Sequence, residues 1–199
     1  MPQQYYYPQT NEELIRHYKL EPHPEGGYYA VTFVMEEKMK SPFASEDEER
    51  NIATCIYYLL CHKSPGCPDR PSHTDDSDKP DSFKTWSSDI GVLHLNKSST
   101  MHVHHAVMGG DIAKSEVRQL LVEGGWWKVS EVPEEDREAA ENGSADGSRV
   151  GALISEVVTP GFHWNDHTYL NQAKLHELFA GCPRAEELYE KYKKYVKEQ

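Results

Sequence analysis

Residues 91–105 read GVLHLNKSSTMHVHH, and this stretch carries the strongest structural signal in the chain. Side chains alternate between the two faces of a β-strand, so His102 and His104 are predicted to point to one face. His94 lies on the preceding apolar run, and a turn at 97–99 would pair the two runs. The three imidazoles would then converge within a β-structure, which indicates a metal site or an acid–base site. The alternative is that they only form hydrogen bonds at the rim of the sheet.

The composition limits the classes of function. The chain has 199 residues, enough for one domain, and 37% of them are hydrophobic, with 4 Trp and 12 Tyr available for the core. An excess of 33 acidic over 21 basic residues gives a net charge of -12, which disfavours nucleic acid and anionic membrane surfaces as partners. The sequence shows neither a secretory signal nor an apolar window of membrane-spanning length. We therefore expect a soluble, cytoplasmic protein in which the cysteines are free thiols.

Hydrophobic periodicity predicts a chain built mainly of strands. A capping box at Thr10–Glu13 predicts a helix that ends near Leu20. Strands are predicted at 28–34, 52–60, 92–95, 101–107, 117–122, 126–132 and 151–159, loops at 36–50, 62–89 and 134–148, and helices at 171–179 and 184–197. The strands at 117–122 and 126–132 are expected to form a hairpin across Gly124 and Gly125. The fold class is therefore all-β, a barrel or sandwich with a short N-terminal helix and a helical tail.

Six motifs then occur in a recognisable order. They are EPHPEGGYY at 21–29, IYYLL at 56–60, GVLHLNKSSTMH at 91–102, GDIAKSE at 110–116, VEGGWWK at 122–128 and ISEVVTPGFHWNDHT at 154–168. In this order they resemble the cupin-5 family (DUF985), in particular its fungal branch. The resemblance implies an RmlC-like jelly-roll barrel, usually a homodimer, with a small-molecule cavity in its mouth, and it implies no settled activity. On this basis residues 10–180 form the cupin domain and residues 181–199 a C-terminal helical tail.

Two departures from the family pattern affect the barrel. Members normally carry two more strands and a turn between 102–105 and 107–111, and residues 62–89 stand where a short turn is expected. Loss of a strand pair would leave the jelly roll incomplete, with unpaired backbone edges. Either the chain is a divergent cupin in which 62–89 partly fill the gap, or its reading frame omits one coding segment and retains a non-coding one. The abrupt change in composition favours the second explanation.

The metal set that many cupins carry is incomplete here. Such cupins place His-x-His on one strand, a Glu a few residues later and another His on a distant strand. In this chain no Glu follows His104 at that spacing, and no His lies near 122–128. The metal candidates are therefore His94, His102 and His104, for zinc, iron, nickel or manganese. Alternatively, His94 and His102 are catalytic as neutral imidazoles that shuttle a proton.

Three functional hypotheses remain open. The first is a protein that binds, isomerises or epimerises a small polar or carbohydrate-like metabolite, the second a metal-dependent cupin enzyme of oxidoreductase or lyase type, and the third a non-catalytic or truncated family member. The ligand-binding candidates are Glu25, Tyr28, Asn96, Gln119 and Trp127. We expect Lys128 to be a solvated charge, with a place in the cavity as the alternative. Residues 160–167 are interpreted as a lid or a dimer contact.

Overall fold

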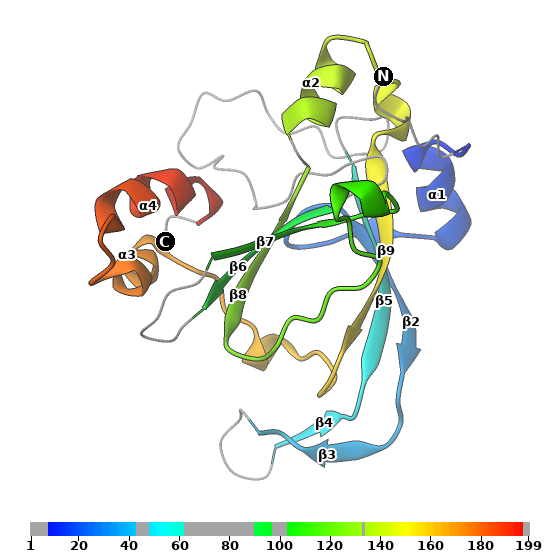
Figure 1. The fold of residues 1–199 in the computed structure, drawn as a ribbon. Coiled ribbons are helices and arrows are strands. Elements are labelled where there is room, and N and C mark those ends of the chain that lie inside the picture. Colours follow the sequence, from blue (N-terminus) through cyan, green and yellow to red (C-terminus); the bar gives the residue numbers. More distant parts are fainter. Residues whose placement is uncertain (1–7, 43–47, 62–89, 97–102, 133, 197–199) are drawn as a thin grey trace.

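The computed structural model describes residues 8–42, 48–61, 90–96, 103–132 and 134–196, and for 90–96 and 134–135 it describes the backbone only (Figure 1). The predicted loop at 62–89, the predicted turn at 97–99 and His102 lie outside the described residues.

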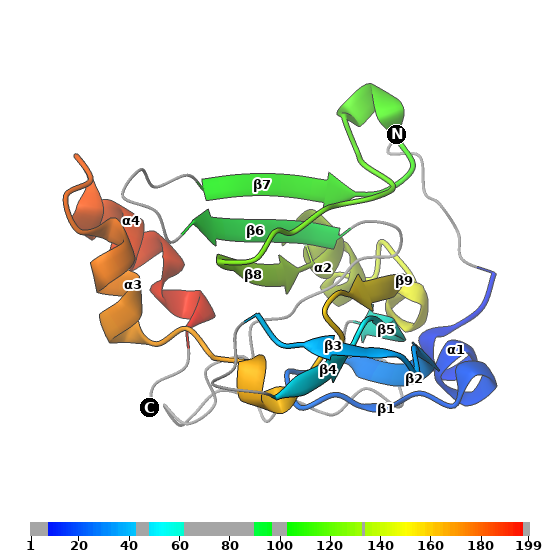
Figure 2. The ribbon, with the colours of Figure 1, turned by 90° about the horizontal axis from the view of Figure 1, so that it is seen from below.

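Two antiparallel sheets form the framework and lie as two layers in Figure 2. The first sheet has the order β1-β2-β5-β9, with β1 at Glu21–Pro22, β2 at Tyr28–Val34, β5 at Thr54–Cys61 and β9 at Gly151–Val158. The second has the order β7-β6-β8, with β6 at Ile90–Asn96, β7 at Val103–Met108 and β8 at Trp126–Glu131. A separate hairpin pairs β3 at Lys38–Lys40 with β4 at Glu49–Asn51.

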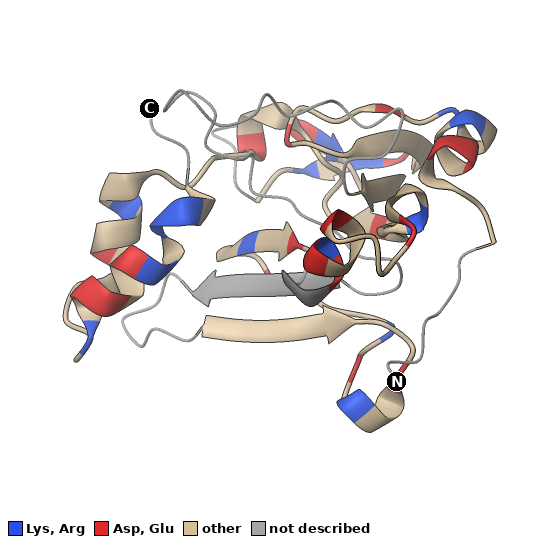
Figure 3. Cartoon of the chain, turned by 90° about the horizontal axis from the view of Figure 1, so that it is seen from above, with Lys and Arg blue, Asp and Glu red and all other residues tan. Residues whose placement is uncertain are grey.

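The described part of the chain also has α-helices and 3-10 turns, and some of these helices pack on the outer faces of the sheets. The α-helices are α1 at Asn11–Tyr18, α2 at Glu134–Glu141, α3 at Gln172–Phe179 and α4 at Ala185–Tyr192, and the 3-10 turns are η2 at Ile112–Lys114, η3 at Gly147–Arg149, η4 at Trp164–Asp166 and η5 at Lys193–Tyr195. The predicted capping box of α1 is present, since Thr10 Oγ1 accepts from the Glu13 backbone and Glu13 accepts from the Thr10 backbone. Figure 3 shows many of the charged residues on these helices.

Three apolar clusters determine which face of each strand is outward. Helix α1 packs on the first sheet through Leu14, Leu20, Tyr28 and Leu59. Helices α3 and α4 pack on β8, where Val129 contacts Leu175 and Phe179. A small third cluster joins Ala152 and Ile154 of β9 to Met108 of β7. The space between the sheets is therefore lined by the β9 face that carries Ala152 and Ile154 and by the β8 face opposite Val129.

The structure confirms several predicted elements and corrects others. The helix at the N-terminus and the strands at 28–34 and 151–159 are confirmed. The predicted loop at 36–50 contains the β3–β4 hairpin, and the predicted loop at 134–148 contains α2, whose Glu, Ala and Arg residues favour a helix. The predicted strand at 117–122 is wrong, because Val117 exchanges backbone hydrogen bonds with Val107 and Gly109, so this segment follows β7 and does not pair with β8.

Two broader expectations also need correction. An all-β class is too simple, since helices pack on both sheets, and the described strands do not close into a barrel. The expectation of free thiols holds for Cys55 and Cys182 and is wrong for Cys61, which is disulfide-bonded.

Candidate functional site

Glu25 lies between two imidazoles near the start of the first sheet. Its Oε1 contacts Nε2 of His167, and its Oε2 lies 3.9 Å from Nδ1 of His23. The Glu25 backbone N–H donates to Nδ1 of His23 at 3.1 Å, so this nitrogen is an acceptor and the neutral ring carries its proton on Nε2. Burial lowers the pKa of His23, with the charge of Glu25 opposing the shift. His23 is therefore a neutral imidazole, and His167 is the direct partner of the carboxylate.

A tight turn fixes Glu25 in this position. Gly26 and Gly27 both have positive φ, at 98° and 73°, which favours glycine. The Gly26 N–H donates to the His23 carbonyl at 2.9 Å, and the Tyr58 hydroxyl donates to the Gly26 carbonyl at 2.7 Å. A Cβ at Gly27 would lie 2.7 Å from the Leu59 carbonyl oxygen. The turn is thus locked against β5, and Glu25 is held at the edge of the space between the sheets.

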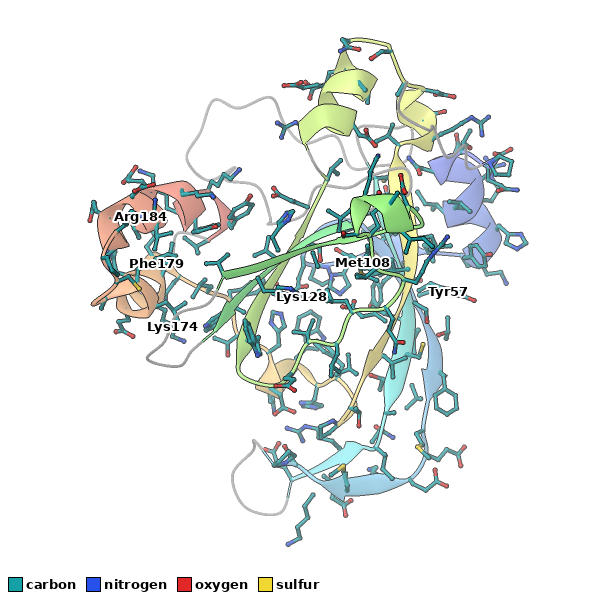
Figure 4. The ribbon with its side chains drawn as sticks, in the orientation of Figure 1. Tyr57, Met108, Lys128, Lys174, Phe179 and Arg184 are labelled. Carbon is teal, nitrogen blue, oxygen red and sulfur yellow. The ribbon has the colours of Figure 1, made fainter. Side chains whose placement is uncertain are left out.

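An ion pair between Lys128 and Glu156 links the two sheets. Because side chains alternate along a strand, Lys128 lies on the face of β8 opposite Val129. For the same reason Glu156 lies on the inner face of β9, as Ile154 does. Figure 4 places Lys128 between the sheets. Burial lowers the pKa of Lys128 to about 8, partly opposed by the negative charge of Glu25. The expectation of a solvated lysine is therefore wrong.

These side chains form one electrostatic unit, which we call the interior cluster. It consists of His23, Glu25, Lys128, Glu156 and His167. The charge of Lys128 and that of His167 both lower the pKa of His23, and Glu25 raises that of Lys128, so the groups influence one another's protonation. The cluster combines carboxylates, imidazoles and an amine whose pKa is lowered to about 8 by burial, and these are the groups that general acid–base chemistry uses.

Aromatic rings stand beside the cluster on the segment after β9. Trp164 lies 5.4 Å from the His167 ring and 6.4 Å from the His23 ring, measured between centroids. Phe162 lies 5.0 Å from Trp164, and Tyr169 lies 4.8 Å from His167. Trp164 is 49% exposed and Phe162 is 42% exposed. These rings offer an accessible apolar face next to the titratable groups.

The same segment is tied to the first sheet and to the β3–β4 hairpin. The Gly161 N–H donates to the Asn51 carbonyl at 2.7 Å, and the Phe162 N–H donates to Thr54 Oγ1 at 3.0 Å. Arg50 of β4 holds Asp166 with two hydrogen bonds. Because Asp166 directly precedes His167, these contacts position the imidazole against Glu25.

Among the residues singled out from the sequence, only Glu25 and Lys128 belong to the interior cluster as described. Tyr28 is buried beneath α1, and Trp127 packs against the α3–α4 cluster with Lys174 Nζ 5.6 Å from its ring centroid. Gln119 is exposed on the segment that leads to β8.

The histidines of the opening stretch are only partly described. His94 pairs in register with His104 on one side and with Lys128 on the other, and Asn96 pairs with Trp126. The side chains of His94 and Asn96, and all of His102, lie outside the described residues. His104 is exposed. Among the described residues no group of His, Cys, Asp or Glu is arranged to hold a metal ion.

Sequence reasoning placed His167 in the segment at 160–167 interpreted as a lid or a dimer contact, and it missed Glu156. A signal for Glu156 exists, because a carboxylate at an inward position of an otherwise apolar strand needs a partner. No local signal exists for His167, whose partner Glu25 is 142 residues away in the chain.

Comparison with known proteins identifies the family to which this chain belongs. The family described as Cupin superfamily (DUF985) matches residues 12–170, so the chain belongs to that family. The chain is 31% identical over 195 residues to the uncharacterized protein YML079W of Saccharomyces cerevisiae, a match that covers 91% of this chain and 85% of that protein. The family resemblance drawn from the motifs is thereby confirmed, and a fungal relative is consistent with the fungal branch.

Solved structures support the fold. A hypothetical protein from Leishmania major superposes with a TM-score of 0.61 at 24% identity, over 89% of this chain and 96% of that chain. Protein SO0799 from Shewanella oneidensis superposes with a TM-score of 0.56 at 20% identity, over 93% of each chain. Within the described ranges, no helix combines the length and the apolar character needed to cross a membrane.

Proposed function

We propose that this cupin binds a small polar or carbohydrate-like metabolite beside the interior cluster and moves a proton on it, as an isomerase or epimerase does. The observation that carries the proposal is the contact of Glu25 with His167 in the same cluster as the Lys128–Glu156 ion pair. An imidazole oriented by a carboxylate is an effective general base near neutral pH. The proposed chemistry uses side chains of this chain and requires no metal.

Each side chain has a distinct proposed role. His167 takes a proton from a carbon next to a carbonyl group, and Glu25 orients the ring and stabilises the imidazolium that forms. Lys128 is the cation that stabilises the negative charge developing on the carbonyl oxygen. Glu156 holds the amine of Lys128 in place. His94 and His102, the catalytic candidates from the sequence, remain in the proposal, and the register of His94 beside Lys128 supports the inclusion of His94.

The ligand class follows from the neighbours of the cluster. The faces of sugar rings are apolar C–H surfaces that pack on aromatic rings, and Trp164 and Phe162 are exposed beside His167. Hydroxyl groups of such a ligand would find partners in Glu25, Glu156 and Lys128. This combination favours a polyhydroxylated small molecule over a purely apolar one.

Ligand-observed NMR with a panel of monosaccharides and small hydroxy-carbonyl compounds tests the proposal. We expect binding to the wild-type chain, weaker binding to Trp164→Ala and normal binding to Phe33→Ala, a control that removes an exposed ring from β2. Equal loss in both variants, or binding of apolar compounds alone, would contradict the assignment. Incorporation of solvent deuterium into the bound compound then separates an isomerase from a binding protein.

A metal-dependent enzyme is the second candidate, and the pairing of His94 with His104 on adjacent strands favours it. His94, His102 and His104 would be the ligands. Metal analysis of untagged protein for zinc, iron, nickel and manganese tests this candidate. Near-stoichiometric metal that is lost in His104→Ala would establish it, whereas metal content that is the same in both proteins would remove His104 from any such site.

The proposal retains a homodimer and a cytoplasmic location as expectations. Gel filtration with light scattering tests the first, and fluorescence microscopy of a tagged chain tests the second. A chain that folds but neither binds the panel nor incorporates deuterium would support the third hypothesis, a non-catalytic or truncated member of the family.

A further inference from the structure

The amine of Lys128 lies in an unusual position for a lysine. It projects from β8 into the space between the sheets and contacts Glu156 on β9. It also lies close enough to Glu25 for their charges to interact, and its own charge lowers the pKa of His23. Its side chain is 30% exposed, so it is not sealed from solvent. A cation needed only to join two sheets would not require this access or these neighbouring acid–base groups.

We propose that Lys128 forms a Schiff base with an aldehyde or ketone, and that carbonyl compounds with several hydroxyl groups are the substrates of the interior cluster. This inference rests on the proposed function and names the substrate class and a covalent step. In that step the protonated Schiff-base nitrogen takes over the charge stabilisation assigned above to the Lys128 ammonium, and Glu156 transfers protons as well as holding the amine. Lysines that act in this way are desolvated and stand beside a carboxyl group that transfers protons. Glu156 is that carboxyl group, and Glu25 with His167 forms the second acid–base pair.

The step balances without any further reactant. Lys128 first gives one proton to Glu156, and the lone pair of its neutral amine attacks the carbonyl carbon, so that a C–N bond forms and the C=O π electrons move to oxygen. The oxygen collects one proton from nitrogen to give a carbinolamine. Glu156 then protonates that hydroxyl, which leaves as water while the nitrogen lone pair forms the C=N bond. The ammonium and the carbonyl compound thus become a protonated Schiff base and one water.

The Schiff base would make the proposed proton transfer easier. Its positive nitrogen withdraws electrons from the adjacent carbon more strongly than a carbonyl oxygen does, so the C–H bond next to it becomes more acidic. His167 would remove that proton, and Glu25 would stabilise the resulting imidazolium. The covalent step and the proton transfer therefore use different members of the same cluster.

Reductive trapping tests the proposal on the full chain. The protein is incubated with dihydroxyacetone or glyceraldehyde and sodium cyanoborohydride, which reduces a Schiff base to a stable secondary amine, and labelled lysines are identified by peptide mass spectrometry. Burial lowers the pKa of Lys128 to about 8 from 10.5, so at pH 7 its neutral fraction exceeds that of an ordinary lysine by roughly 300-fold. We expect labelling of Lys128 at least about tenfold faster than of the surface residues Lys114 and Lys174.

Variants separate this proposal from the proposed function. His167→Gln should abolish deuterium exchange while Lys128 is still trapped, and Glu156→Gln should slow trapping more than Glu177→Gln, an exposed control on α3. The labelling of Lys128, Lys114 and Lys174 is compared within the wild-type protein, so this result does not depend on whether any variant folds. Labelling of Lys128 no faster than that of Lys114 and Lys174 would overturn the Schiff base, even if deuterium exchange by the wild type still supports the proposed function. Trapping of Lys128 without any deuterium exchange would support the Schiff base and contradict the proposed proton transfer.

Discussion

Arg50 and Asp166 form a two-pronged contact, in which Nε donates to Oδ2 at 2.7 Å and Nη2 donates to Oδ1 at 2.9 Å. Arg50 is 5% exposed, and its Nη2 also donates to Glu48 at 2.7 Å. The contact joins β4 to η4, the turn directly before His167. A hairpin that is separate from both sheets thereby helps to position a residue of the interior cluster.

Arg50 is therefore a positioning residue for His167. We expect Arg50→Met to slow deuterium exchange with little change in the trapping of Lys128, because Lys128 lies on the other sheet. Arg50→Lys should restore exchange only partly, since a lysine cannot form the two parallel hydrogen bonds. Equal losses of exchange and trapping would show that the substitution disturbs the whole cluster.

The same contact predicts an acid-dependent contribution to stability. Hydrogen bonds from Arg50 hold the pKa of Asp166 below its ordinary value of 3.8. Because the folded-state pKa is depressed, the contribution is present above pH 3.8 and is lost as the pH falls through the folded value. Urea unfolding between pH 6 and pH 2.5 should show a shallower acid loss for Asp166→Asn than for the wild type, and parallel curves would contradict this.

Gly27 and Gly125 allow a matched test of the turn that holds Glu25. Both have positive φ, 73° and 87°, so alanine at either position carries a conformational cost of about 1–2 kcal/mol. Only at Gly27 would the new Cβ also meet a backbone oxygen, that of Leu59 at 2.7 Å, whereas nothing lies within 4 Å at Gly125. We expect Gly27→Ala to lower the free energy of unfolding clearly more than Gly125→Ala. Similar losses in denaturant titrations would show that the turn is not locked against β5.

Lys128 should make stability rise with pH in the alkaline range. Burial lowers its pKa to about 8 from the ordinary value of 10.5, so between these values the unfolded chain binds a proton that the folded chain does not. The free energy of unfolding therefore gains up to about 3 kcal/mol from this residue between pH 8 and 10.5. Lys128→Met should remove that rise, with Lys114→Met as the control. Identical slopes for wild type and Lys128→Met would contradict the burial of the amine.

Two phenylalanines separate stability from ligand binding. Phe179 is fully buried between α3, α4 and β8, so Phe179→Ala should cost about 3–5 kcal/mol of unfolding free energy. Phe162 is exposed beside Trp164, so Phe162→Ala should cost less than about 1 kcal/mol and weaken ligand binding. Calorimetric melting and ligand-observed NMR measure the two effects. Normal ligand binding by Phe162→Ala would exclude its ring from the binding surface.

Local sequence patterns predicted the elements whose causes are local. The capping box predicted α1, and apolar runs predicted β2 and β9, because each of these signals depends on residues that are close together in the sequence. The β3–β4 hairpin was missed because its strands are charged and exposed, as expected for a pair outside the core. The segment at 117–122 was misassigned because the Gly124–Gly125 turn favoured pairing with 126–132, whereas Val117 forms its backbone hydrogen bonds with Val107 and Gly109 beside β7.

The interior cluster shows where sequence reasoning stops. Glu25 was singled out because it flanks a glycine turn, but Lys128 was expected in solvent, since a lysine on an alternating strand is normally outward. Its inward position follows from the packing of its neighbour Val129 against α3 and α4. His167 lies on a loop whose placement depends on Arg50, more than a hundred residues earlier. No spacing rule connects such groups, whereas the sheet topology does.

The central claim is that Glu25 and His167 transfer a proton on a bound hydroxy-carbonyl compound. The most direct measurement is the incorporation of solvent deuterium at the carbon next to the carbonyl group of each compound that binds, followed by NMR in D₂O. The account predicts incorporation with the wild type and with the exposed controls Glu177→Gln and His17→Gln, and none above background with Glu25→Gln or His167→Gln. Incorporation at the same rate with all of these proteins, or with none of them although the compound binds, would contradict it.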